Sequence, residues 1–329
     1  MNQPIHIGSI YIRSAAGIAP RQGEPGQGEP DYRTLLDPKL LRRMSRIIRM
    51  GAAAALTCLR EAGIAMPDAI VTGTAYGCLE DTGLFLNSMI ERNEGMLQPA
   101  AFIQSTHNTV GAQIALLVGC TGYNNTFVHR GFSFESALLD AVFLLADEEA
   151  ATVLVGGVDE ITDMSRALLT RFGLYRRTIA GEGAAFFLLA RQRSGDDLAR
   201  LDGMTTFYRP STEHQPSTEN QPSTEEKVKQ ELLTFLQLHG LTAEDIDMVV
   251  TGDNGDEKGD RIYREVIRSL FPEKANITFK DRSGEYPTST SFALWLAAQN
   301  VKSGVGRVLL YNHYLGIYHS VYLLSHADK

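Results

Sequence analysis

Short apolar segments alternate along the chain with longer segments of helical periodicity. Residues 5–12 alternate apolar and polar side chains, which is typical of a half-buried strand. Residues 37–63 instead repeat apolar side chains every three or four positions, with Pro38 suited to a first helical turn and Gly63 to a helix stop. This alternation predicts a layered α/β protein.

The same pattern continues to the C-terminus. It predicts strands at residues 69–77, 125–129, 152–155, 184–190, 204–208, 247–251, 277–279, 307–311 and 321–324, and helices at 81–92, 108–118, 133–146, 227–239, 260–271 and 289–301. Gly119 is expected to end one helix and Ser133 to cap the next. Because the order restarts near residue 200, we expect two similar halves, residues 1–200 and 201–329, in one compact unit.

A short tandem repeat lies near the start of the second half. Three hexapeptides that begin at Pro210, Pro216 and Pro222 share the letters Pro-Ser-Thr-Glu and contain no apolar side chain. Ordering such a segment costs conformational entropy that no burial offsets. We therefore predict a flexible surface loop over residues 210–227, with a docking motif as the alternative.

Composition and charge exclude several classes of protein. The 43% hydrophobic content supports a sizeable core, and the net charge of −8 argues against broad nucleic-acid binding. The longest apolar runs are too short to span a bilayer, and the N-terminus lacks the basic and apolar regions of a signal peptide. We therefore expect a cytoplasmic protein.

No pattern indicates a metal or another cofactor, and none is expected. Cys58, Cys78 and Cys120 have no metal spacing and are expected to be buried thiols of a reducing compartment. The histidines His107, His313 and His319 are scattered, and residues 252–260 lack the terminal glutamate of a calcium loop.

Three stretches of the first half share an order and a spacing typical of one family. They are Asn-Thr-Val-Gly-Ala-Gln-Ile-Ala at 108–115 with Gly-Cys-Thr-Gly-Tyr-Asn at 119–124, the double-glycine turn within 153–160, and Ala-Gly-Glu-Gly-Ala-Ala at 180–185. Together they resemble stretches before and after the nucleophile of the β-ketoacyl synthases. Gly259-Asp260, Lys280 and Gly284 fit later landmarks of that family, so the resemblance covers most of the chain.

The resemblance implies a thiolase-like α/β/α/β/α sandwich of two similar halves, and a dimer formed beside the nucleophile strand. In this family a cysteine at the N-terminus of a buried helix takes an acyl chain from a carrier protein as a thioester, because the helix dipole favours the thiolate. Two histidines then assist decarboxylation of the malonyl unit and stabilise the developing oxyanion.

All three catalytic positions of the family fall on residues without that chemistry. Counting twenty-five residues back from Gly156 places Gly131 at the cysteine position. Counting eight residues back from Asp260 places Gly252 at the first histidine, and five residues on from Lys280 is Glu285, at the second. The comparison implies that the fold was kept while the condensing reaction was lost.

Residues near Gly131 leave relocated chemistry open. His129 is either a base or a hydrogen-bonded structural residue, and Ser133 is either a substitute nucleophile or a helix cap. Cys120 could be a reactive thiol, although nothing in the sequence identifies an activating base.

A basic stripe recurs every three or four residues on the first long helix. Its members are Lys39, Arg42, Arg43, Arg46 and Arg49. It is either a solvated helix face or a docking surface for an acidic carrier protein or its phosphopantetheine phosphate.

The function that the resemblance implies is that of a non-catalytic partner. Such a chain resembles chain-length factors, which pair with an active ketosynthase in fatty-acid, polyketide or aryl-polyene-type biosynthesis and shape the tunnel for the growing chain. Its expected partners are an active ketosynthase or a second copy of itself, and an acyl carrier protein. The alternatives are an acyl-transfer or thioesterase-like enzyme with a relocated nucleophile, and a module that binds acyl carriers or acyl-CoA without chemistry.

Overall fold

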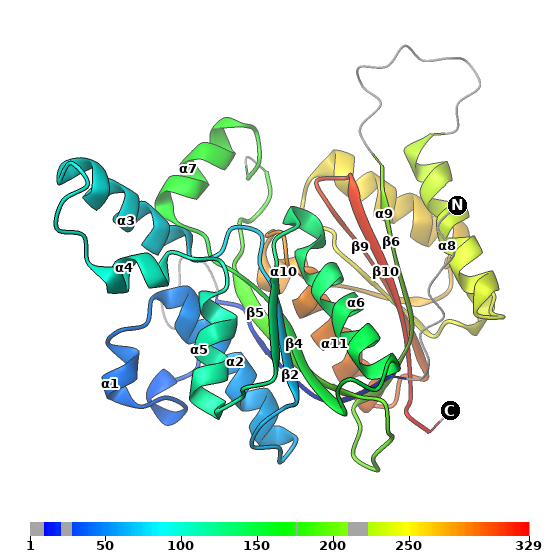
Figure 1. The fold of residues 1–329 in the computed structure, drawn as a ribbon. Helices are drawn as coiled ribbons and strands as arrows, with labels where there is room; N and C mark the ends of the chain where they lie inside the picture. Colours follow the sequence, from blue (N-terminus) through cyan, green and yellow to red (C-terminus); the bar gives the residue numbers. More distant parts are fainter. Residues whose placement is uncertain (1–9, 21–27, 176, 210–222, 329) are drawn as a thin grey trace.

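One ten-stranded mixed sheet extends through the whole molecule (Figure 1). The computed structural model describes residues 10–20, 28–175, 177–209 and 223–328. The strand order is β3-β2-β4-β5-β1-β6-β10-β9-β7-β8, and β1 pairs with β6 at the middle of the sheet.

The first half of the chain contributes five of these strands. They are β1 (Ile10–Ile18), β2 (Ala69–Gly73), β3 (Tyr123–Phe127), β4 (Thr152–Asp159) and β5 (Gly183–Ala190). The helical segments of this half are η1 (Tyr32–Thr34), α1 (Pro38–Leu41), α2 (Arg46–Glu61), α3 (Leu79–Glu91), α4 (Pro99–Gln104), α5 (Thr109–Val118), η2 (Arg130–Phe132), α6 (Ser133–Ala146) and α7 (Asp163–Arg171).

The second half contributes the other five strands. They are β6 (Ala199–Tyr208), β7 (Met248–Thr251), β8 (Ala275–Thr278), β9 (Arg307–Tyr314) and β10 (Tyr318–Ser325). Its helical segments are α8 (Thr224–Leu238), η3 (Ala243–Asp245), α9 (Glu257–Leu270), α10 (Lys280–Ser283) and α11 (Thr290–Lys302).

The two halves have the same strand order. From each outer edge inward, the third, second, fourth, fifth and first strand of that half follow one another. In both halves the first three positions are parallel and the inner strands antiparallel. This repeated topology confirms the expectation of two similar halves.

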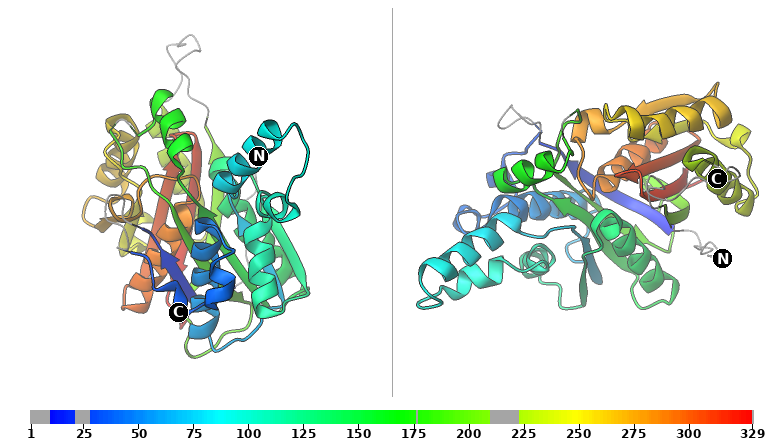
Figure 2. Two further views of the ribbon diagram at one scale, coloured as in Figure 1. Left: turned by 90° about the vertical axis from the view of Figure 1, so that its left-hand side faces the viewer. Right: turned by 90° about the horizontal axis from the view of Figure 1, so that it is seen from above.

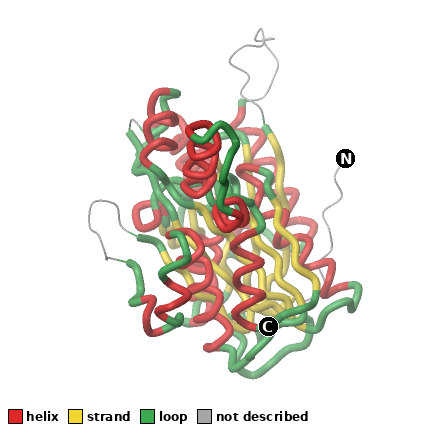
Figure 3. Tube along the Cα trace, turned by 60° about the vertical axis from the view of Figure 1, so that its left-hand side comes forward, coloured by secondary structure: helices red, strands yellow, loops and turns green. Residues whose placement is uncertain are grey.

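Helices fill the space between the two halves of the sheet and cover both outer faces. A central core joins α6 and α11 to strands of both halves, through residues such as Leu138, Ala297 and Leu310. A second core packs α2 and α5 against the first half, and a third packs α8 and α9 against the second. These layers form the predicted thiolase-like sandwich, in which helices and strands alternate through the molecule (Figures 2 and 3).

Several predicted segments differ from the structure. Of the strand expected over residues 5–12, residues 5–9 lie outside the described residues, and β1 continues to Ile18. The strand expected over residues 69–77 ends at Gly73. The helix expected over residues 37–63 is divided into α1 and α2, because the chain turns at residues 42–45 and buries Met44. Of the predicted repeat loop, residues 210–222 lie outside the described residues. Residues 223–227 are not a loop, because Ser223 accepts a hydrogen bond from the Glu226 amide and starts α8.

Candidate functional site

Gly131 lies in η2, immediately before the buried helix α6. An added Cβ at Gly131 would lie 2.8 Å from Tyr314 Cδ1 and 2.8 Å from Tyr318 Cγ. Both are ring atoms, so the contact is relieved only if a whole ring moves. The Tyr318 ring is itself held edge-on by Phe132 and Tyr208, at centroid distances of 5.0 Å and 5.4 Å. Two packed aromatic rings therefore occupy the space that a side chain at Gly131 would need.

Gly252 directly follows β7 and is similarly enclosed. An added Cβ would lie 2.7 Å from Tyr263 Oη and 2.9 Å from Lys280 Cε, and would also contact Asn312 Oδ1. The Tyr263 hydroxyl donates to Asn312 Oδ1 at 3.0 Å and accepts from the His313 amide at 2.8 Å. A hydrogen-bonded wall thus leaves no room for an imidazole at Gly252.

Glu285 is buried and forms an ion pair. Its Oε2 lies 2.8 Å from Lys280 Nζ and accepts a hydrogen bond from Asn254 Nδ2. Its Oε1 has no hydrogen-bond partner among the described residues. Burial raises the pKa of Glu285, and the charge and hydrogen bond of Lys280 oppose that rise. This position therefore carries a carboxylate that is bound to a buried ammonium group.

The three positions converge on the end of β9. Asn312 lies beside Gly252, and Tyr314 packs against Gly131. Between them, the His313 carbonyl accepts a hydrogen bond at 2.9 Å from Lys280 Nζ, which is paired with Glu285. The structure thus brings together three positions that sequence counting had located separately.

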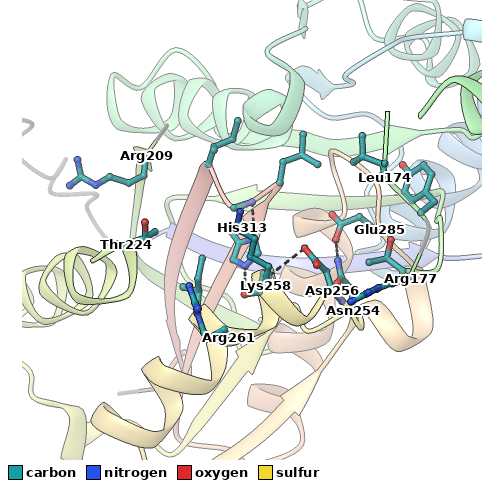
Figure 4. Close-up of a pocket in the computed structure, with 18 of the residues that line it drawn as sticks. Leu174, Arg177, Arg209, Thr224, Asn254, Asp256, Lys258, Arg261, Glu285 and His313 are labelled. Atoms are coloured by element: carbon teal, nitrogen blue, oxygen red, sulfur yellow. Dashed lines mark hydrogen bonds between the residues drawn. The ribbon is translucent and has the colours of Figure 1, made fainter. Parts of the chain in front are cut away.

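A pocket of about 660 Å³ opens beside Glu285 (Figure 4). It lies between residues 172–175, 177 and 178, the start of α9 and the β9–β10 turn at residues 315–317. Its lining includes the basic side chains Arg177, Arg209, Lys258 and Arg261.

Two aspartates of residues 252–260 accept hydrogen bonds from backbone amides and so hold the local chain. Asp260 accepts from the amides of Asn254 at 3.0 Å and Gly255 at 2.9 Å. Asp256 caps α9 by accepting from the Gly259 amide at 3.3 Å. In the described parts of the chain no three His, Cys, Asp or Glu side chains are grouped as a metal site.

The candidates for relocated chemistry are arranged differently from the prediction. Ser133 is not an N-cap: Phe132 takes that position, and the Ser133 hydroxyl donates to the Arg130 carbonyl at 2.8 Å and accepts from the His129 amide at 2.9 Å. The reason is that η2 runs directly into α6, which makes Ser133 the first helical residue. The His129 ring instead meets Ser136, with Nδ1 2.9 Å from the hydroxyl oxygen.

The three cysteines are free thiols. Cys120 is only partly buried, contrary to the prediction of three buried thiols, and its Sγ lies 3.4 Å from the Pro67 carbonyl. Burial raises the pKa of Cys58 to about 12, and it also raises that of Cys78. High pKa values leave both buried thiols protonated and unreactive.

The basic stripe does not form one helical face. Arg46 pairs with Glu29 at 2.6 Å and with Glu182, and Arg49 Nε donates to the Met44 carbonyl at 2.8 Å. The turn at residues 42–45 separates these two arginines from the others. Only Lys39, Arg42 and Arg43 remain exposed as a possible docking surface.

Sequence reasoning missed the two rings over Gly131 and the Asn254 contact to Glu285. The two rings are those of Tyr314 and Tyr318. Strand alternation could have placed both rings on one face, because they form a cross-strand pair in the β9–β10 hairpin. No local signal indicates that this face meets Gly131.

Comparison with known families now decides the classification. The family described as beta-ketoacyl synthase, N-terminal domain, matches residues 18–239. The chain belongs to the β-ketoacyl synthase family. A search of curated protein sequences found no significant match. None of the helices within the described residues has the length and apolar character needed to cross a membrane.

Solved ketosynthase structures have the same fold. The ishigamide ketosynthase/chain length factor matches with a TM-score of 0.75 at 14% identity, over 97% of this chain and 99% of that chain. A ketosynthase in complex with its chain length factor from Xenorhabdus doucetiae matches with a TM-score of 0.73 at 14% identity, over 99% and 100%. A type II polyketide synthase acyl-carrier protein in complex with its ketosynthase matches with a TM-score of 0.73 at 13% identity, over 97% and 99%.

Proposed function

We propose that this ketosynthase-family chain is a non-catalytic subunit that pairs with an active ketosynthase, in the manner of a chain length factor. The observation that carries the proposal is the state of the nucleophile position. Gly131 has no side chain, and the rings of Tyr314 and Tyr318 fill the adjacent space. An acyl thioester needs a thiol at that point and room for the acyl chain beside it.

The other two positions support the same conclusion. Gly252 has no acid–base group, and its surroundings exclude one. Glu285 carries a carboxylate that accepts hydrogen bonds from Lys280 and Asn254, whereas a developing oxyanion needs a donor. Condensation would require a second protein that supplies all three groups.

The comparisons suggest the nature of that protein. Two similar structures combine a ketosynthase with a chain length factor, and a third holds a carrier protein with its ketosynthase. The proposed partner is therefore an active ketosynthase that works on carrier-bound acyl chains in polyketide- or fatty-acid-type biosynthesis. The proposal places both subunits in the cytoplasm.

Co-expression with a ketosynthase from the same source tests this proposal. A tag on this chain should retain the ketosynthase in a one-to-one complex by native mass spectrometry. After incubation with acyl-carrier substrate, intact mass should show an acyl group on the ketosynthase subunit only. Tyr318→Ala, which enlarges the space at Gly131, should change product length, whereas Leu238→Ala on the distant helix α8 should not.

An acyl adduct on this chain itself would instead favour relocated chemistry. Ser136 would be the first residue to substitute, because its hydroxyl lies 2.9 Å from His129 Nδ1. A homodimer that binds no ketosynthase and gains no acyl adduct would contradict both the chain-length-factor proposal and the relocated-chemistry alternative.

Carrier binding without chemistry is the second candidate, and the pocket beside Glu285 favours it. Basic side chains at the pocket, including Arg177 and Arg261, could attract a phosphate-bearing carrier arm. Charge reversal at these two residues should weaken carrier binding at low salt. The same change at Arg42 and Arg43 tests the exposed remainder of the basic stripe. The variant that binds the carrier protein more weakly identifies the docking surface.

A further inference from the structure

The β9–β10 hairpin carries different chemistry on its two faces. Tyr314 and Tyr318 lie on the face toward Gly131. His313 and His319 lie on the opposite face, where His313 stacks on Tyr263 of α9 at a centroid distance of 4.3 Å and His319 stacks on Phe207 of β6 at 4.8 Å. Strand alternation causes this division, because successive side chains point to opposite faces.

Both imidazoles hold the hairpin tip, residues 314–317. The Gly316 amide donates to His313 Nδ1 at 3.2 Å, and His319 Nε2 donates to the Gly316 carbonyl at 3.2 Å. On their other sides, His313 Nε2 donates to the Gly259 carbonyl at 3.1 Å, and His319 Nδ1 lies 2.9 Å from Tyr311 Oη. Each ring therefore links the tip to a neighbouring element or strand.

The bonds of His313 require a neutral ring. His313 Nδ1 accepts from an amide and Nε2 donates to a carbonyl, so its proton must be on Nε2. A second proton on Nδ1 would face the Gly316 N–H across 3.2 Å and break that bond. The proton of neutral His319 is on Nε2, which faces a carbonyl, while the Tyr311 hydroxyl can donate to Nδ1. Because that hydroxyl can also accept, a charge on His319 is opposed by its full burial against Phe207 and by nearby Arg209 rather than by a lost hydrogen bond.

The surroundings oppose a positive charge on either ring. The charged and titratable groups that face the two histidines or the Tyr311 ring beside them come from several elements: Lys280 of α10, Tyr263 of α9, Arg209 after β6 and Glu225 of α8. The two histidines also face each other at a centroid distance of 5.7 Å, and the Asp256 carboxylate lies on the His313 side, since Asp256 Oδ2 and His313 Cε1 would each lie 3.1 Å from a Cβ added at Gly259. Neither imidazole forms an ion pair with a carboxylate in the described structure. Burial, and then Lys280, lower the pKa of His313 far below its ordinary value. Burial lowers that of His319 to about 4.

The hairpin tip is also strained. Leu315 has φ 58° and Gly316 has φ 67°, and the Ile317 amide closes the turn on the Tyr314 carbonyl at 3.2 Å. A leucine in the left-handed region has an unfavourable backbone energy. The hydrogen bonds of the two histidines to Gly316 help to keep the turn in this conformation.

We propose that protonation of His313 and His319 releases the hairpin tip below neutral pH, which opens one wall of the pocket and withdraws Tyr314 and Tyr318 from Gly131. The tip supplies Leu315, Gly316 and Ile317 to the pocket wall, so its release changes access to the pocket. The proposal rests on these contacts alone and does not depend on the proposed function.

The direction and size of the effect follow from proton linkage. In the released tip each imidazole regains an ordinary pKa of about 6.5, whereas the held rings stay neutral. Lowering the pH from 7.5 to 5.5 therefore favours release by about tenfold for each histidine and by about a hundredfold for both.

Amide hydrogen exchange on the full chain tests this inference. Protection factors, corrected for intrinsic exchange, should fall by about a hundredfold at Gly316 and Ile317 between pH 7.5 and 5.5, while those of β4 stay constant. The double variant His313→Asn/His319→Gln offers uncharged groups to the same tip atoms and should abolish the pH dependence. His326→Gln, at a histidine outside the hairpin, should behave like the original protein.

Constant protection at the tip down to pH 5.5 would overturn the inference. So would an equal fall in the double variant, because then groups other than these histidines would control the tip. If the double variant does not fold, NMR of the original protein with selectively labelled histidines decides. If the imidazoles of His313 and His319 stay neutral at pH 5.5 and the tip amides keep their protection, release of the tip by protonation is excluded.

Discussion

Gly131 lies just before α6 and Glu135 lies in its first turn, and the surroundings of the two positions are opposite in kind. At Gly131 the core leaves no space for a side chain. At Glu135 it encloses a carboxylate whose two oxygens have no hydrogen-bond partner among the described residues. Both positions depend on β10, which supplies Tyr318 to the first and approaches the second with Ser320 and Tyr322.

Restoring the cysteine at Gly131 should destabilise the protein. Gly131→Cys forces Tyr314 or Tyr318 to move, and overpacking of this kind costs about 1–3 kcal/mol. We expect that loss in denaturant unfolding, with no acylation of the new thiol. Gly195→Cys is the matched control, because an added Cβ at Gly195 meets nothing within 4 Å.

A double-mutant cycle locates the cause of that loss. Combining Gly131→Cys with Tyr318→Ala should cost at least about 1 kcal/mol less than the sum of the single changes, because the small residue relieves the contact. Strict additivity would mean that Tyr318 does not limit the space.

Glu135 should make stability fall as pH rises. Desolvation raises its pKa from 4.5 to about 7, so the folded protein favours the protonated form. The stability gained by protonation is complete below about pH 4.5 and is lost as pH rises toward 7, by about 3 kcal/mol in all. Glu135→Gln should therefore stabilise the protein by about 2–3 kcal/mol at pH 8 and not at pH 4.5. The measurement is urea unfolding at both pH values, with the exposed Glu149→Gln as a control that gains at neither.

At the scale of single elements, the β9–β10 hairpin connects the site to the rest of the second half. Its two strands place Asn312 toward Gly252, Tyr314 and Tyr318 toward Gly131, and the two histidines toward α9 and β6. A one-residue shift in its register would reverse both faces, so the turn that sets the register matters for the site.

Leu315 is the unfavourable residue in that turn. Both central residues, Leu315 and Gly316, have positive φ, which is the geometry of a type I′ turn and favours Asn-Gly. Leu315→Asn should raise stability by about 1 kcal/mol, since the exposed leucine loses little packing. Leu315→Ala keeps the backbone strain and should give no gain in a thermal unfolding series.

At the scale of the whole molecule, β3 is an outer edge of the sheet and pairs only with β2 in the described structure. Exposed apolar side chains belong to this edge and to the helices beside it: Tyr123 of β3, Val128 directly after β3, Leu116 of α5 and Phe143 of α6. An open strand edge beside apolar surface is suited to subunit association. The family resemblance led us to expect a dimer beside the nucleophile strand, and β3 is the strand that precedes Gly131.

A charge at this edge should disrupt assembly. Leu116 is 76% exposed, so Leu116→Asp should leave the subunit folded while it weakens association at least tenfold in sedimentation analysis. Leu238→Asp introduces the same charge at a 54% exposed leucine on α8, far from β3 in the sheet order, and should leave assembly unchanged. Equal effects of both variants would remove β3 as the contact.

The amino-acid sequence by itself determined the alternating elements and the repeated halves, and it predicted the three family positions. These follow from local features: apolar side chains at the period of a helix or strand, and glycine landmarks at fixed spacing. Local features failed where neighbouring elements run together, as with η2 and Ser133, or where a buried residue breaks a helical pattern, as with Met44.

Only the tertiary structure decided what surrounds those positions. The rings over Gly131, the Lys280 and Asn254 partners of Glu285, and the imidazole contacts of the hairpin tip all join residues from different elements. Periodicity states which face of an element is apolar, but not which other face it meets. That choice is made when the two halves of the sheet enclose α6 and α11, because close packing then allows each buried group only the neighbours that fit.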